Sequence, residues 1–120
     1  ALQYLIGEIK NNKDINLYHG GDFYRDYIHV DDVCAAMKFL MDNSPVNNIY
    51  NIGNGRPTKF LDLMNYVKSK TNSISKFNTI IPPEFHKNVQ VRDAHLDTTK
   101  IESLGYSNKI SIWDGLNDIL

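Results

Sequence analysis

One arginine in the sequence has the surroundings of a phosphate ligand. Arg25 follows the glycine turn at residues 19–22 and precedes a short apolar run. An arginine at the edge of a strand presents a planar fork of N–H donors that suits a phosphate. On these residues alone, the simpler interpretation is a surface arginine paired with Asp22 or Asp26.

A second segment, residues 49–57, could bring backbone close to a ligand. It contains Gly53 and Gly55 and ends at Arg56 and Pro57. Where a strand turns through glycines into a helix, a ligand can approach the backbone closely, and the N-terminus of the helix points outward. The simpler alternative is a tight turn that joins the two elements.

Other motifs that carry chemistry are missing from the sequence. Gly53 and Gly55 are not followed by the third glycine of a dinucleotide-binding turn. The sequence also contains no P-loop lysine motif and no nucleophile elbow. These residues alone therefore predict no catalytic site.

The cysteine and the histidines do not suggest a metal site. A single cysteine, Cys34, excludes an internal disulfide and a cysteine-based zinc site. Because Cys34 lies within an apolar helical pattern, we expect a packed core thiol. His19, His29, His86 and His95 are scattered, and none has the i, i+4 spacing to another histidine that would place two ligands on one helix face.

Composition limits the class of protein. The 120 residues suffice for one small domain, with 42% hydrophobic and 22% charged residues. A net charge of −1 argues against nucleic-acid binding. No apolar run approaches the length of a membrane span, and residues 1–10 lack the basic start of a signal peptide. We therefore expect a cytoplasmic protein.

Apolar spacing predicts helices that alternate with short strands, an α/β pattern. The helix that Asp31 or Asp32 could cap is expected to bury Val33, Ala36, Met37 and Leu40. The expected helices are 2–9, 31–40, 57–67, 97–104 and 111–120, and the expected strands are 15–18, 27–30, 47–52 and 77–81. Such short strands cannot make a sheet of ordinary width, which suggests part of a larger protein.

Four segments in order resemble the extended short-chain dehydrogenase/reductase enzymes that act on nucleotide sugars. They are Arg25 to Asp32, Tyr50 to Gly55, Asp97 to Tyr106 and Ser111 to Leu120. The resemblance is closest to UDP-glucose 4-epimerase-like and ADP-glyceromanno-heptose 6-epimerase-like members. It implies NAD or NADP as the cofactor of the parent enzyme, with no cofactor expected to bind this chain alone.

The resemblance also implies the placement of the chain in its parent. The family's glycine-rich turn and Tyr-x-x-x-Lys pair are not in the sequence; Tyr66 and Lys70 have that spacing but lie after the family's Asn-Ile-Gly motif. We therefore expect a C-terminal fragment without catalytic residues. Residues 1–29 and 57–120 would form part of the substrate domain, and residues 30–56 the last helix and strand of the Rossmann domain.

The resemblance assigns substrate-binding roles to six residues. Arg25 would contact the diphosphate of the sugar nucleotide, and Asn16 and Tyr18 would line its base and sugar. The further nucleotide ligands would be Arg56, after the glycine turn, and Lys87 or Arg92 as a second phosphate ligand. Asp26, Asp31 and Asp32 are expected to be helix caps and turn partners.

The predicted function is therefore the substrate-binding part of an NAD(P)-dependent nucleotide-sugar epimerase or dehydratase. The expected partner is a nucleoside diphosphate sugar, without nucleic acid, membrane or metal, and the parent is expected to be a homo-oligomer. The alternative is a non-enzymatic module that binds a nucleotide sugar or another chain.

Overall fold

The computed structural model describes residues 2–89 and 91–120, which divide into two compact units. The first unit consists of the described residues up to Arg25, then Thr58–Asp93 and Leu120. The second unit consists of Asp26–Pro57 and Ala94–Ile119. Each unit is described by itself below.

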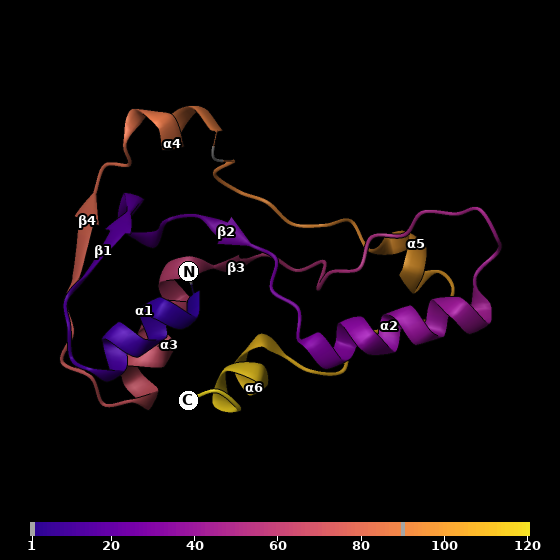
Figure 1. Cartoon of the computed structure of the whole chain (residues 1–120), viewed down its shortest axis with the longest axis horizontal. Coiled ribbons are helices and arrows are strands. Elements are labelled where there is room, and N and C mark those ends of the chain that lie inside the picture. Colours follow the sequence, from indigo (N-terminus) through magenta and orange to yellow (C-terminus); the bar gives the residue numbers. More distant parts are fainter. Residues whose placement is uncertain (1, 90) are drawn as a thin grey trace. The chain divides into compact units, whose positions relative to one another are not determined.

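The first unit contains two small sheets. Strand β1 (Ile15–Tyr18) pairs in parallel with β4 (Phe77–Ile80), with Ile15 opposite Phe77. Strand β2 (Tyr24–Arg25) pairs antiparallel with β3 (Thr58–Lys59). Figure 1 shows β1 beside β4. The strands predicted at 15–18 and 77–81 are therefore confirmed.

Helices α1 (Leu2–Lys10) and α3 (Phe60–Lys70) pack together and supply most of the core of this unit. Ile6 and Ile9 of α1 are buried, as are Leu63, Met64 and Val67 of α3. Their spacing of three and four residues places each set on one helix face. Ile15 and Leu17 of β1 also point into this core, because alternate residues of a strand share a face.

A 3₁₀ turn, η1 (His19–Gly21), follows β1 and directs the chain toward β2. Gly20 and Gly21 have φ angles of 63° and 78°, which L side chains rarely adopt. A Cβ atom on Gly21 would lie 3.1 Å from Leu61. Glycine therefore allows the turn to pack closely against the start of α3.

The second unit is built around α2 (Val30–Asn43), with the short helices α5 (Thr99–Glu102) and α6 (Ile112–Asn117). The carboxylate of Asp32 is buried and accepts hydrogen bonds from the backbone N–H groups of Lys109 (3.0 Å) and Ile110 (2.9 Å). It thereby fastens the chain before α6 to α2. None of the helices among the described residues is long and apolar enough to cross a bilayer.

Asp26 has a similar structural role in the second unit. Its carboxylate accepts from the backbone N–H groups of Asn54 (2.7 Å), Gly55 (3.1 Å) and Leu96 (3.0 Å). A Cβ atom on Gly53 would lie 2.8 Å from the same carboxylate, so a residue without a side chain is needed there. Asp26 and Asp32 are thus turn partners, as the sequence predicted.

The predictions for the start of α2 and for two strands were wrong. The helix begins at Val30, and its cap is His29, whose Nδ1 accepts from the Asp31 N–H (3.2 Å), rather than Asp31 or Asp32. Residues 27–30 and 47–52 do not form strands. A strand needs a neighbouring strand for its backbone hydrogen bonds, and the two sheets of the described structure pair other segments.

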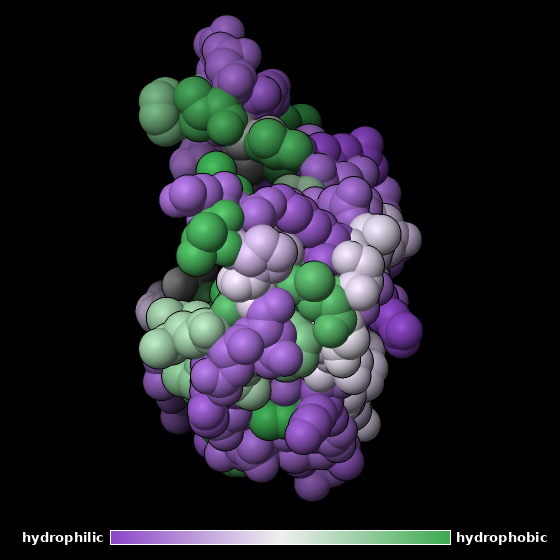
Figure 2. All heavy atoms as spheres, turned by 90° about the vertical axis from the view of Figure 1, so that its right-hand side faces the viewer, coloured by the Kyte–Doolittle hydropathy of each residue, from purple (hydrophilic) through white to green (hydrophobic). Residues whose placement is uncertain are grey.

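The prediction that Cys34 and Met37 are core residues was also wrong. The helix buries Ala36, whereas the Cys34 thiol is exposed and Met37 is 56% exposed. With Val30 and Met41, these two residues form an exposed row, here called the α2 apolar stripe. Figure 2 faces the side on which α2 lies in Figure 1 and shows hydrophobic residues at the surface among hydrophilic ones.

Candidate functional site

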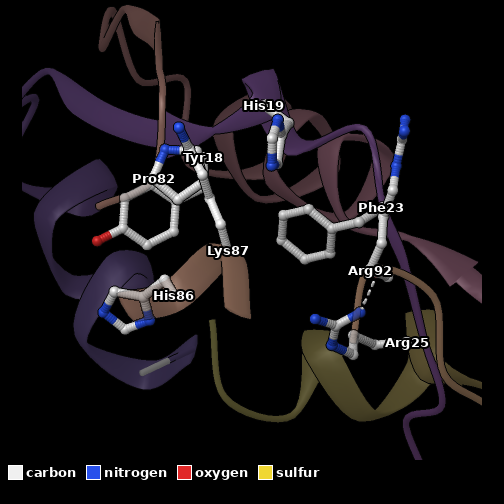
Figure 3. Close-up of a pocket in the computed structure, with 8 residues that line it drawn as sticks. All are labelled: Tyr18, His19, Phe23, Arg25, Pro82, His86, Lys87 and Arg92. Atoms are coloured by element: carbon white, nitrogen blue, oxygen red, sulfur yellow. Dashed lines mark hydrogen bonds between the residues drawn. The ribbon is translucent and has the colours of Figure 1, made fainter. Parts of the chain in front are cut away.

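A cavity of about 250 Å³ lies in the first unit, beyond the carboxyl ends of β1 and β4. Because these strands are parallel, the residues that follow them meet at one edge of the sheet, where ligands of α/β folds often bind. Tyr18 ends β1, and Pro82 follows β4 by two residues. The lining, drawn in Figure 3, consists of Tyr18, His19, Phe23, Arg25, Pro82, His86, Lys87 and Arg92.

One side of the cavity is aromatic. Proline lacks the N–H that a strand needs, so Pro82 and Pro83 end β4, and α4 (Glu84–Val89) follows. The helix places the His86 ring 5.4 Å from the Tyr18 ring, with the ring planes at 43°. Figure 3 shows the two rings next to each other on one side of the pocket.

On the other side, an aromatic stack supports Arg25. The rings of Phe23 and Phe60 are stacked with centroids 4.8 Å apart. The Phe60 N–H donates to the Phe23 carbonyl (2.9 Å) beside the β2–β3 pair. The guanidinium of Arg25 lies 4.8 Å from the Phe23 ring centroid, within the range of a cation–π interaction.

The guanidinium of Arg25 donates only to backbone carbonyls among the described residues. Its Nη1 donates to Tyr24 O (2.8 Å) and to Arg92 O, and its Nη2 donates to Val91 O (2.9 Å). Carbonyl oxygens orient a guanidinium without cancelling its charge. The positive charge of Arg25 therefore remains available to an anion.

Asp22 pairs with two cations at the rim. Its Oδ1 lies 2.9 Å from Lys59 Nζ, and its Oδ2 lies 2.9 Å from Arg92 Nη2. The hydrogen bond and charge of Lys59, and then those of Arg92, lower the pKa of the Asp22 carboxyl. By contrast, the Lys87 ammonium has no hydrogen bond or ion pair with any residue in the described ranges. Arg25 and Lys87 are therefore the cations of the cavity without a carboxylate partner there.

Four of the six predicted site residues line this cavity: Tyr18, Arg25, Lys87 and Arg92. Asn16 is exposed on β1 and accepts a hydrogen bond from Asn78 Nδ2 (3.2 Å), without lining the cavity. Arg56 belongs to the second unit, where it lines a separate polar hollow of about 450 Å³.

Four lining residues were missed by the sequence reasoning: His19, Phe23, Pro82 and His86. The parallel pairing of residues 77–80 with residues 15–18 brings His19 and Pro82, which follow the two strands, to the same edge of the sheet. Tyr66 and Lys70, which have the spacing of a Tyr-x-x-x-Lys pair, lie on α3. The Lys70 ammonium is 5.4 Å from the centroid of the Tyr66 ring, and neither residue lines the cavity.

Comparisons with known proteins show which enzymes the chain resembles. Residues 1–53 match the model of the NAD dependent epimerase/dehydratase family. An ADP-L-glycero-D-manno-heptose-6-epimerase of Brachyspira hyodysenteriae is 27% identical over 104 residues, which are 86% of this chain and 32% of that protein. The putative GDP-L-fucose synthase 2 of Arabidopsis thaliana is 31% identical over 121 residues, covering 98% of this chain and 35% of the relative.

Solved structures of the same family share the fold. The UDP-glucose 4-epimerase of Thermotoga maritima, solved with UDP-glucose, matches with a TM-score of 0.82 and 28% identity over 97% of this chain and 37% of its own. The dTDP-glucose 4,6-dehydratase of Bacillus anthracis, solved with NAD, has a TM-score of 0.77 at 18% identity, covering 96% and 36% of the two chains. The latter shows the fold alone.

The chain is therefore a relative of the NAD dependent epimerase/dehydratase enzymes, and the resemblance predicted from its four motifs is confirmed. The α/β class is confirmed as well. The chain spans about a third of the length of the first curated relatives, 32% and 40% of them. Two solved structures with this fold hold a cofactor: the Thermus thermophilus UDP-glucose 4-epimerase holds NAD, and the Pseudomonas aeruginosa RMD protein holds NADPH.

Proposed function

We propose that the cavity of the first unit binds the nucleoside diphosphate of a sugar nucleotide. The observation that carries the proposal is the combination of two cations without carboxylate partners, Arg25 and Lys87, with the aromatic pair of Tyr18 and His86. Such a cavity combines positive charge with aromatic rings. A nucleoside diphosphate has the matching parts, a flat base and an anionic diphosphate.

The chemistry of the two kinds of side chain supports this assignment. Guanidinium and ammonium groups form short, charge-assisted hydrogen bonds to phosphate oxygens. Aromatic rings stack on nucleobases, typically stabilising each stacked base by about 1–3 kcal/mol. We infer that the Tyr18 and His86 rings contact the base, while Arg25 and Lys87 contact the diphosphate.

The parent reaction would be epimerisation or dehydration of the sugar by an NAD(P)-dependent enzyme. In such enzymes the nicotinamide carries the hydride, while the protein binds and orients the sugar nucleotide. This chain would supply the binding part. The similarity to these enzymes supports that role. The greater length of the relatives supports a longer parent, and a cytoplasmic, homo-oligomeric parent stays a prediction.

We further propose that residues 30–56 belong to the cofactor-binding domain of that parent. The α2 apolar stripe and Ile49, which is 85% exposed, support this placement. A contiguous apolar surface of this kind is normally covered in a soluble protein. A neighbouring parallel sheet would cover α2 and give residues 47–52 the strand partner that they lack within the described ranges.

Titration of the chain with UDP, ADP and GDP, followed by calorimetry, tests the binding proposal. We expect at least one of them to bind, and Lys87→Ala to weaken that binding about tenfold because one charge-assisted hydrogen bond is lost. Lys76→Ala is the matched control, since Lys76 is an exposed lysine of the same unit outside the cavity. Binding of none of the three, or equal effects of the two substitutions, would contradict the proposal.

A further inference from the structure

The hydrogen bonds of Arg25 use three of the N–H groups of its guanidinium and leave two without an acceptor in the described ranges. A guanidinium has five N–H groups. Three donate to the carbonyls of Tyr24, Val91 and Arg92, using both N–H groups of Nη1 and one of Nη2. The Nε–H and the second N–H of Nη2 have no acceptor among residues 2–89 and 91–120. In a guanidinium, the Nε–H and one N–H of Nη2 form an edge that can bind two oxygens of one phosphate.

The segment that Arg25 contacts, residues 91–93, is attached to residues 22–25 by polar contacts. Besides the two carbonyls bound to Arg25, Asp93 Oδ1 accepts from the Tyr24 N–H (2.9 Å), and Arg92 pairs with Asp22 (2.9 Å). Val91 is 66% exposed, so apolar burial contributes little to this attachment. The contacts that do not involve Arg25 are exposed and polar, so losing the two bonds to the guanidinium should loosen the segment.

We propose that Arg25 is a positioning residue that holds the 91–93 segment in place at the cavity. One end of its guanidinium binds the segment through the two carbonyls. The open edge faces the anion, an assignment that rests on the proposed function. The Phe23 ring beneath the guanidinium keeps its plane in the orientation that serves both contacts. Figure 3 shows the bond from Arg25 to the Arg92 backbone beside the Phe23 ring.

A consequence is that lysine cannot replace Arg25, although it keeps the charge. An ammonium is a point donor without the planar fork, so it cannot bridge two adjacent carbonyls and also present a parallel pair of N–H groups. Arg25→Lys should therefore release residues 91–93 even in the absence of ligand.

The Tyr24 amide reports directly on this release, because its N–H donates to Asp93. In the ligand-free chain, we expect Arg25→Lys to speed hydrogen exchange of the Tyr24 amide about tenfold, as expected for the loss of a hydrogen bond to a charged donor. The Phe60 amide, bound to the Phe23 carbonyl, should exchange as before. Arg56→Lys, at an exposed arginine of the second unit, is the control and should change neither.

Arg25→Lys could also unfold the β2–β3 region and expose the Phe60 amide. For that case, ¹⁵N NMR of the arginine side chains in the unaltered chain gives a second test. Hydrogen bonds to carbonyls slow the rotation of the guanidinium, so the Nη nitrogens of Arg25 should give separate ¹⁵N NMR signals. Those of Arg56 should be averaged into one. A single averaged signal for Arg25, or equal Tyr24 exchange in the unaltered chain and the folded variant, overturns the positioning role.

Titration with UDP, ADP and GDP separates this inference from the proposed function. If the unaltered chain binds one of them and Arg25→Lys weakens binding without changing Tyr24 exchange, the positioning role is wrong and the proposed function stands. If Tyr24 exchange rises as expected but the unaltered chain binds none of the three, the positioning role stands and the proposed function is wrong.

Discussion

Asp22 sets the charge at the rim of the cavity. Asp22 forms ion pairs with Lys59 and Arg92, so the positive charge of Arg92 is partly neutralised. The charges of Arg25 and Lys87 have no carboxylate partner in the described structure. The anion would thus meet its strongest attraction at Arg25 and Lys87. Arg92 contributes to the site through its backbone carbonyl, which holds Arg25, as well as through its side chain.

The pKa of Asp22 gives a testable prediction at the level of one residue. Lys59 lowers this pKa below its ordinary value of 3.8. A carboxyl with a lowered pKa in the folded state contributes stability above its ordinary pKa, and that contribution is lost as the pH falls through the lowered value. A ¹³C NMR titration should therefore show Asp22 ionising below the ordinary value, and Lys59→Met should move its pKa upward. An unchanged midpoint in Lys59→Met would contradict the pairing.

At the level of elements, α2 and α3 show how two helices of similar apolar spacing differ in what they bury. The apolar stripe of α3 faces α1 and is fully buried. The stripe of α2 that contains Cys34, Met37 and Met41 is exposed, while Ala36 on another face is buried. The difference comes from which neighbours each helix has, because spacing alone does not say which face is covered.

This difference predicts that shortening a side chain lowers the free energy of unfolding much more in α3 than in α2. Leu63→Ala should lower the free energy of unfolding by about 2–5 kcal/mol, since it leaves a cavity in the core of the first unit. Met41→Ala, at a position 85% exposed, should change it by less than about 0.5 kcal/mol. Urea unfolding followed by circular dichroism measures both. Similar costs at the two positions would mean that α2 is covered in solution.

For the whole molecule, the α2 apolar stripe predicts how the isolated chain behaves at high concentration. Exposed apolar surface favours association when no partner covers it. We expect light scattering to show a mass that rises with concentration, and the double substitution Met37→Ser, Met41→Ser to reduce that rise. Lys38→Ser, at an exposed residue of the same helix, is the control. A strict monomer before any substitution would argue against an interface on this helix.

Local pattern was enough to predict much of this protein. Apolar spacing predicted a helix where the structure has α3, and the alternation of residues 15–18 predicted a strand. Both depend on periodicity within a few residues. The four motifs between Arg25 and Leu120 predicted the resemblance to the enzyme family in the same way, because they consist of residue types at fixed positions in the sequence.

Only the tertiary structure decided which segments meet. The parallel pairing of β1 with β4 joins residues about 60 positions apart and brings His86 against Tyr18. The exposure of Cys34 depends on where the neighbours of α2 lie, and the partners of Arg25 are carbonyls that any residue type would provide at positions 91 and 92. Every residue has a backbone carbonyl, so the sequence does not indicate which carbonyls accept a hydrogen bond, and only the tertiary structure does.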